Sequence, residues 1–229
     1  MNESQNSLNS QNTQNSLNSQ NTQNSLNSQN TQNSQNQNSQ NQNSQNSQNQ
    51  NSQNQNSQNR KIKCLITDFD ETFFKTAIAA PLKQSKPIDW DKIYSLIPQF
   101  EMYPGWQEVM NWLKENNIMF AVVSQSTRGI LSRTFKHFGV EPAYVGCFSL
   151  FHRKPHVKNL QKALDALGLE KDEVISVGNS INDYTQAQMT GVRFVGACWD
   201  SLHTEKLKEL GQTADNPLQL IDILKETIK

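Results

Sequence analysis

Short, mainly apolar runs alternate with amphipathic segments from residue 61 onward. Such runs predict strands that are covered on both faces of a sheet, and they occupy residues 64–66, 118–123, 144–148, 174–177 and 193–197. Between them, apolar residues recur at the spacing of helices near residues 106–113, 128–138, 160–167, 203–210 and 217–228. Because strand and helix alternate throughout, we expect an α/β fold with a parallel sheet as the middle of three layers.

One segment interrupts this alternation. Residues 73–103 follow the first predicted strand and contain no run typical of a central strand. Asp89 can cap a helix in this segment, and the apolar face of that helix carries Trp90, Ile93, Tyr94 and Ile97. We expect a short helical insert that faces a substrate, in which Trp90 and Tyr94 either contact the substrate or pack inside the insert.

Residues 1–59 differ in composition from the rest of the chain. They consist almost wholly of Asn, Gln, Ser and Thr, and Glu3 is their single charged residue. A nonapeptide occurs three times, over residues 5–31, but one leucine per repeat cannot build a stacked core. We therefore expect a disordered tail over 1–59 and a folded domain over 60–229. Because Asn- and Gln-rich tracts can form polar ladders, the tail is also a candidate for self-association.

The overall charge argues against nucleic acid and membrane as partners. The chain has 21 basic and 21 acidic residues and no basic stripe interleaved with aromatic residues. No apolar run approaches the roughly 20 residues of a membrane span, and the chain opens with polar residues rather than a basic and apolar leader. We expect a cytoplasmic protein. Cys64, Cys147 and Cys198 are far apart in apolar surroundings, which predicts buried thiols rather than disulfides.

Candidate chemistry is concentrated where the first strand ends. Asp68 and Asp70 follow that strand and are spaced one residue apart. Ligands of open α/β sheets bind beyond the carboxyl ends of the strands, so both acids are expected in one cleft. A carboxylate can attack phosphorus when a cation offsets the charge repulsion and a second acid handles the proton of the leaving group. The pattern predicts a phosphoryl-transfer site in which Asp68 and Asp70 divide these roles.

Four short motifs occur in order along the chain. They are Asp68-Phe69-Asp70-Glu71-Thr72, Ser124, Lys154 before Pro155, and Gly178-Asn179-Ser180-Ile181-Asn182-Asp183. Their order, and their positions after apolar strands, resemble the haloacid dehalogenase superfamily over residues 61 to about 225. The resemblance implies a Rossmann-like fold with a cap insert at about 73–103, which is shorter than the four-helix caps of larger members.

The resemblance also implies a role for each residue. Asp68 would attack phosphorus and carry the phosphoryl group, and Asp70 would protonate the leaving oxygen and then activate water. Phosphate oxygens would be held by Thr72, Ser124 and Lys154. Mg²⁺ would be held by Asp68, Asp70, Asn179 and Asp183. We expect a Mg²⁺-dependent phosphatase that hydrolyses a small phosphorylated metabolite through an aspartyl-phosphate.

Asn179 departs from the family pattern, which usually has aspartate at that position. An amide oxygen suits Mg²⁺ in kind but brings no charge, so metal binding is expected to weaken. Two alternatives stay open at this point. A phosphotransferase or mutase of the same superfamily would share every motif, and a catalytically impaired relative could have a binding or assembly role. The sequence does not decide which phosphate ester is used.

Overall fold

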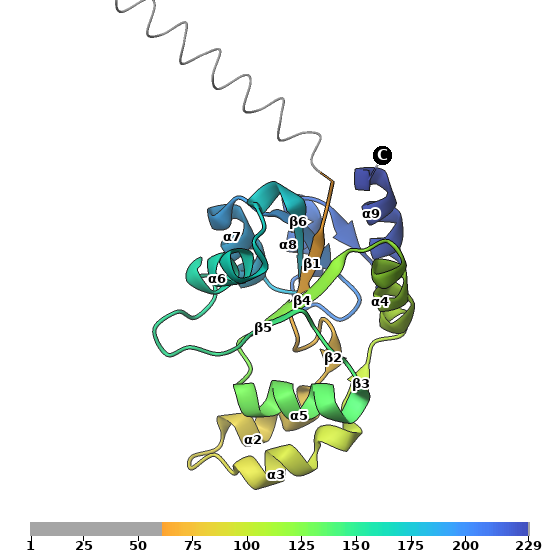
Figure 1. Cartoon of the computed structure of the whole chain (residues 1–229). Coiled ribbons are helices and arrows are strands. Elements are labelled where there is room, and N and C mark those ends of the chain that lie inside the picture. The colour runs from red at the N-terminus through yellow and green to blue at the C-terminus, as the bar shows by residue number, and fades with distance from the viewer. Residues whose placement is uncertain (1–60, 229) are drawn as a thin grey trace, which may run out of the picture. The chain divides into compact units, whose positions relative to one another are not determined.

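The computed structural model describes residues 61–228, and one parallel sheet forms their centre (Figure 1). The six strands lie in the order β5-β4-β1-β6-β7-β8, and every neighbouring pair is parallel. Their bounds are Cys64–Thr67 (β1), Met119–Val123 (β4), Tyr144–Gly146 (β5), Val174–Gly178 (β6), Arg193–Ala197 (β7) and Thr213–Ala214 (β8). The predicted α/β class with a parallel sheet is confirmed. The predicted tail, residues 1–59, lies outside the described residues.

Strand β1 lies inside the sheet and is covered on both faces, as its apolar run predicts. All four of its residues are buried. Leu65 belongs to the apolar cluster on one face of the sheet, whereas Cys64 and Ile66 belong to the cluster on the other face. Since successive side chains of a strand point to opposite faces, helices are needed on both sides, and the sheet becomes the middle of three layers.

Helices cover the two faces of the sheet in separate groups (Figure 1). The first group consists of α4 (Trp106–Glu115), α5 (Arg128–Phe138) and α9 (Gln219–Ile228). The second group consists of α6 (Lys158–Leu167), α7 (Ile181–Thr190) and α8 (Thr204–Leu210). Gly139 ends α5 and Gly168 ends α6, with φ of 66° and 65°. Both ends are where the sequence predicts them, because glycine tolerates this left-handed backbone.

The insert between β1 and α4 is helical, as expected, and a short antiparallel strand pair closes its base. The pair consists of β2 (Phe74–Lys75) and β3 (Glu101–Met102). Its helical turns are Ala77–Ala79, α2 (Ala80–Gln84), α3 (Trp90–Ser95) and Ile97–Gln99. The carboxylate of Asp89 accepts a hydrogen bond from the backbone N–H of Lys92 at 3.0 Å and so caps α3, as predicted.

Three details differ from the sequence prediction. Strand β5 ends at Gly146 instead of residue 148, because the backbone N–H of Phe148 bonds the carbonyl of Ser126 in the loop before α5. The β2–β3 pair and β8 are absent from the prediction, since strands of two residues carry too few positions for a period to be recognised.

The described residues include no helix with the length and apolar character needed to cross a membrane. Within the same residues all three cysteines are free thiols. Cys64 is buried as predicted, whereas Cys147 and Cys198 are only partly buried.

Candidate active site

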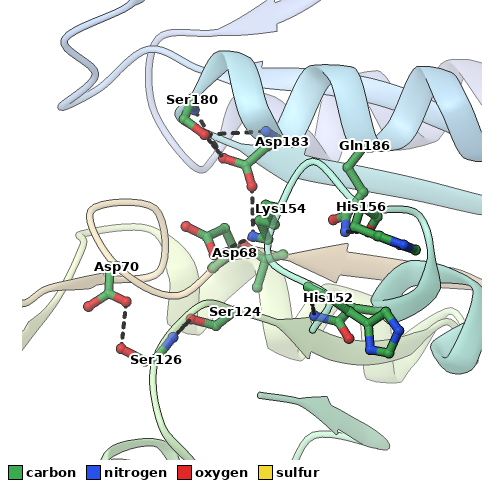
Figure 2. A network of polar contacts seen from close by, with 12 residues as sticks. Asp68, Asp70, Ser124, Ser126, His152, Lys154, His156, Ser180, Asp183 and Gln186 are labelled. Atoms are coloured by element: carbon green, nitrogen blue, oxygen red, sulfur yellow. Dashed lines mark hydrogen bonds and ion pairs between the residues drawn. The ribbon is translucent and has the colours of Figure 1, made fainter. Parts of the chain in front are cut away.

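Three charged side chains from distant parts of the chain meet at the carboxyl end of the sheet (Figure 2). Asp68 follows β1, Asp183 lies in the first turn of α7 after β6, and Lys154 comes from the loop between β5 and α6. The Lys154 Nζ lies 2.6 Å from Oδ1 of Asp68 and 2.6 Å from Oδ1 of Asp183. Two carboxylates therefore share one ammonium group at this end of the sheet.

This cluster is shielded from solvent. The side chains of Asp68, Lys154 and Asp183 are 11%, 6% and 5% exposed. Charges this deep need close partners, because the loss of hydration is otherwise too costly. The short contacts of the ammonium with both acids supply that compensation, and the cluster thereby depends on all three residues.

Asp183 is fixed by the start of its own helix. Its Oδ2 accepts hydrogen bonds from the backbone N–H and the hydroxyl of Ser180, at 3.1 and 2.6 Å. The Ser180 hydroxyl in turn accepts from the backbone N–H of Asp183, which completes a capping box. Gly178 makes room beside it, since a Cβ there would lie 2.4 Å from the Cβ of Asp183. The glycine of the fourth motif is thus explained by the close approach of Asp183.

The loop that delivers Lys154 is anchored on both sides of the lysine (Figure 2). The side-chain amide of Asn159 donates to the carbonyl of His152 at 2.9 Å. The amide of Gln186, which is 3% exposed, donates to the carbonyl of His156 at 2.7 Å. Both histidines thus take part in holding the loop through their backbone, which sets the position of the ammonium group.

Asp70 points to a different set of partners. Its Oδ1 accepts from the Thr76 hydroxyl at 2.6 Å and from the Lys83 ammonium at 2.8 Å, and its Oδ2 accepts from the Ser126 hydroxyl at 2.6 Å. Sequence reasoning missed Thr76, Lys83 and Ser126 as site residues. The motifs carry no signal for them, because Thr76 and Lys83 belong to the insert and Ser126 to a loop that opens a helix.

Burial and neighbouring charges move the pKa values of these groups in different directions. Burial raises the pKa of Asp68 to about 7, and the carboxylates of Asp183 and Asp70 act in the same direction, whereas Lys154 opposes them. Burial alone would lower the pKa of Lys154, but Asp183 and Asp68 raise it. Burial would likewise raise the pKa of Asp70, yet Lys83 and the hydroxyls of Ser126 and Thr76 hold it below its usual value.

We expect Asp68 to make the free energy of unfolding depend on pH. Its native pKa of about 7 exceeds the unfolded value of about 3.9, so on acidification the native state takes up the proton first. The resulting stabilisation is complete below about pH 4 and is lost as the pH rises through about 7.

Urea unfolding in buffer with a chelator, at about pH 5 and about pH 7.5, tests this linkage. The wild-type protein should lose more stability between the two pH values than Asp68→Asn does, since asparagine does not titrate. Equal losses in the two proteins would contradict the assignment.

Two predicted phosphate ligands are fully buried. The Ser124 hydroxyl accepts from the backbone N–H of Ser126 at 2.9 Å and donates no hydrogen bond to another group among residues 61–228. The Thr72 hydroxyl is buried without a hydrogen-bond partner in the described part of the chain. The carbonyl of Thr72 accepts from the indoles of Trp106 and Trp199, at 2.9 and 3.0 Å. Their contact with a phosphate stays a prediction.

The residues predicted to hold Mg²⁺ are only partly assembled. Among residues 61–228 there is no group of three or more His, Cys, Asp or Glu side chains arranged to hold a metal ion. Asp68 and Asp183 do lie within reach of one cation, and their carboxylate oxygens are the donors that Mg²⁺ prefers. The carboxylate of Asp70 bonds Thr76, Lys83 and Ser126 instead. The donor set therefore suits Mg²⁺ through Asp68 and Asp183.

The chain resembles known proteins in sequence and in fold. The family model described as haloacid dehalogenase-like hydrolase matches residues 5–197. A pyrophosphatase of Halalkalibacterium halodurans is 30% identical over 96 residues, which make up 41% of this chain and 45% of that protein. A phosphoglycolate phosphatase of Haemophilus influenzae is 31% identical over 98 residues, 42% of this chain and 44% of that protein. The chain thus spans slightly less than half the length of these curated relatives.

The fold is shared with solved structures at low sequence identity. A hydrolase of the same superfamily, subfamily IA, from Geobacter sulfurreducens superposes with a TM-score of 0.56 at 20% identity. The superposition covers 71% of this chain and 96% of that one.

Proposed function

Because the chain belongs to the haloacid dehalogenase-like hydrolase family, we propose that it is a Mg²⁺-dependent phosphatase that hydrolyses a small phosphate monoester. The observation that carries this proposal is the buried cluster of Asp68, Lys154 and Asp183 at the carboxyl end of the sheet. The two relatives are named for the removal of phosphate from small molecules. A small phosphorylated metabolite is accordingly the proposed substrate.

Asp68 is the proposed nucleophile. One of its carboxylate oxygens forms a bond to phosphorus while the bond to the leaving oxygen breaks, which gives an aspartyl-phosphate. The ionised form must attack, and the contact with Lys154 at 2.6 Å favours that form against the effect of burial. The same ammonium group can attract the oxygens of the phosphoryl group as charge moves onto them.

Asp70 is the proposed acid and base. It gives a proton to the leaving oxygen in the first step and takes one from the attacking water in the second. Burial would raise the pKa of Asp70, but Lys83 lowers it, which favours the carboxylate form that accepts a proton from water in the second step. For the first step Asp70 must carry a proton, and the proton that it takes from water in the second step restores this form for the next turnover. Thr76 and Ser126 orient it through hydrogen bonds of 2.6 Å each.

Mg²⁺ would be held by Asp68, Asp183 and the side-chain oxygen of Asn179. When bound, it would offset the negative charge of the carboxylates and of the phosphate. Lys154 contributes one positive charge to the same cluster, while Ser124 is placed to donate a hydrogen bond from its hydroxyl.

The Mg²⁺ dependence of phosphate release tests the function and the effect of Asn179 together. We expect the full-length protein to release phosphate from an aryl phosphate ester and to lose this activity in a chelator. Asn179→Asp should bind Mg²⁺ about ten- to a hundredfold more tightly, because it restores the charge that the family pattern has at this position. Titration calorimetry measures the binding, and the same Mg²⁺ series measures the rate.

The outcomes separate the alternatives. An inactive wild type with an active Asn179→Asp would identify a decayed catalyst. Activity that survives the chelator would contradict the Mg²⁺ dependence. Absence of activity on every phosphate ester in both proteins would refute the phosphatase proposal.

A further inference from the structure

A pocket lies between the insert and the loops that follow β4 and β5. Its volume is about 450 Å³, and Asp70 is one of its lining residues. The others are Lys83, Ile88, Trp90, Gln125, Ser126, Thr127, Ile130, Phe148 and Arg153. Asp68 is not part of the lining. An acid that protonates a leaving oxygen must contact the leaving group, so this pocket is where the rest of the substrate would lie.

Two polar atoms of this lining are buried without a partner. They are the side-chain nitrogen of Gln125 and the hydroxyl of Thr127, and neither has a hydrogen bond within the described part of the chain. Both atoms have almost no accessible surface, so a ligand in the pocket does not reach them as the side chains lie, and polar contact with a ligand depends on the exposed Arg153.

Arg153 adds a positive charge that no acid balances. Its guanidinium lies 5.1 Å from the centre of the Phe148 ring, and no carboxylate pairs with it among residues 61–228. The other cation of the pocket, Lys83, is already paired with Asp70 at 2.8 Å. The lining therefore carries a net charge of about plus one, and Arg is suited to bind carboxylate or phosphate through two parallel hydrogen bonds.

The remaining walls are apolar and partly open. Ile88 and Trp90 are each 37% exposed, and Trp90 stacks on Tyr94 with ring centres 6.2 Å apart. Trp90 and Tyr94 were each expected either to contact the substrate or to pack inside the insert. Trp90 lines the pocket and so fits the first alternative, whereas Tyr94 packs behind it. A partly exposed indole in the same lining as the Arg153 guanidinium suits an organic group with a negatively charged end.

We propose that this pocket binds the leaving group of the substrate, and that this group carries an oxyanion held by Arg153. The inference rests on the proposed phosphatase function, since the role of Asp70 places the leaving group here. The oxyanion is a carboxylate or a second phosphate. The substrate class is accordingly a small phosphate compound with a second negative charge.

Turnover of matched compounds tests the proposal in the full-length protein. The substrates are 2-phosphoglycolate, inorganic pyrophosphate and ethyl phosphate, of which the last has no second anion. We expect the wild type to prefer at least one of the first two over ethyl phosphate in kcat/KM. Arg153→Met should reduce that preference about ten- to a hundredfold, the range for a lost hydrogen bond to a charged group. Whether the preferred compound is phosphoglycolate or pyrophosphate identifies the oxyanion.

Arg133→Met is the matched control. Arg133 is also stacked on an aromatic ring, that of Tyr94 at 4.2 Å, but it is not part of the pocket lining. The control should keep the wild-type preference. An unchanged preference in Arg153→Met, or an equal loss in both variants, would overturn the proposal.

A binding experiment separates this proposal from the proposed function. Asp68→Asn protein, with and without Arg153→Met, is titrated with 2-phosphoglycolate, pyrophosphate and ethyl phosphate by calorimetry. Tighter binding of a doubly anionic compound that depends on Arg153 would support the pocket even if no compound is turned over. Equal binding of all three compounds, or absence of binding, would overturn the proposal whether or not the protein is a phosphatase.

Discussion

Replacing Asp68 with Asn is expected to reduce the rate of phosphate release by at least about a thousandfold, the scale seen when a catalytic nucleophile is removed. An amide does not attack phosphorus, so the aspartyl-phosphate cannot form. Asparagine has nearly the same shape, and Lys154 keeps Asp183 as its partner at 2.6 Å. The loss should therefore appear in kcat and not in the folding of the protein.

The assay compares wild type, Asp68→Asn and the control Asp222→Asn at saturating Mg²⁺ and substrate. Asp222 is 76% exposed in its side chain and lies in α9, away from the cluster, so its replacement should leave the rate unchanged. Thermal melting of the same samples shows whether they are folded. A folded Asp68→Asn protein with a normal rate would rule out Asp68 as the nucleophile.

Replacing Lys154 with Met is expected to lower the free energy of unfolding by about 3–5 kcal/mol near neutral pH. This is the cost of removing one partner of a buried ion pair while the other partner stays buried and charged. The methionine keeps most of the volume but leaves Asp68 and Asp183 buried without their shared cation. The carboxyl of Asp68, whose pKa is already about 7, should then take up a proton more readily. The loss of stability should thus be smaller at about pH 5 than at about pH 7.5.

Urea unfolding in a chelating buffer measures this effect. The matched control is Lys206→Met, whose ammonium lies 2.7 Å from Glu209 but is 59% exposed. An exposed pair contributes only about 0–1 kcal/mol, so the control should change little. A loss below about 1 kcal/mol in Lys154→Met would mean that the two carboxylates do not depend on the ammonium for their stability in the fold.

The sequence by itself determined the layers of this protein and the positions of its motif residues. The apolar run at residues 64–66 predicts a strand covered on both faces, and the structure has β1 with Leu65 on one side and Ile66 on the other. Asp89 predicts the start of α3 and Gly139 the end of α5. These features are local. They depend on the alternation of side chains along a strand, on helix-capping residues and on the backbone preference of glycine, all of which involve residues close together in the sequence.

The meeting of the motif residues could also be predicted, but only by way of the fold class and the family resemblance. Parallel strands bring their carboxyl ends to one edge of the sheet, which predicts Asp68 and Asp70 in one cleft, and the family resemblance adds Lys154 and Asp183 to that site. The structure brings Asp68, Lys154 and Asp183 together. Asp70 is near enough to raise the pKa of Asp68, but its hydrogen bonds go to Lys83 and Ser126.

Only the tertiary structure decided which residues surround Asp70 and which line the pocket. Lys83 lies in α2, a helix of five residues whose pattern does not mark it as special, and it reaches Asp70 because the insert folds back over the end of β1. Arg153 and Gln125 come from two different loops and meet at the same pocket. Such contacts join residues far apart in sequence through loop conformation, and loops carry no hydrophobic period from which their side-chain positions could be read.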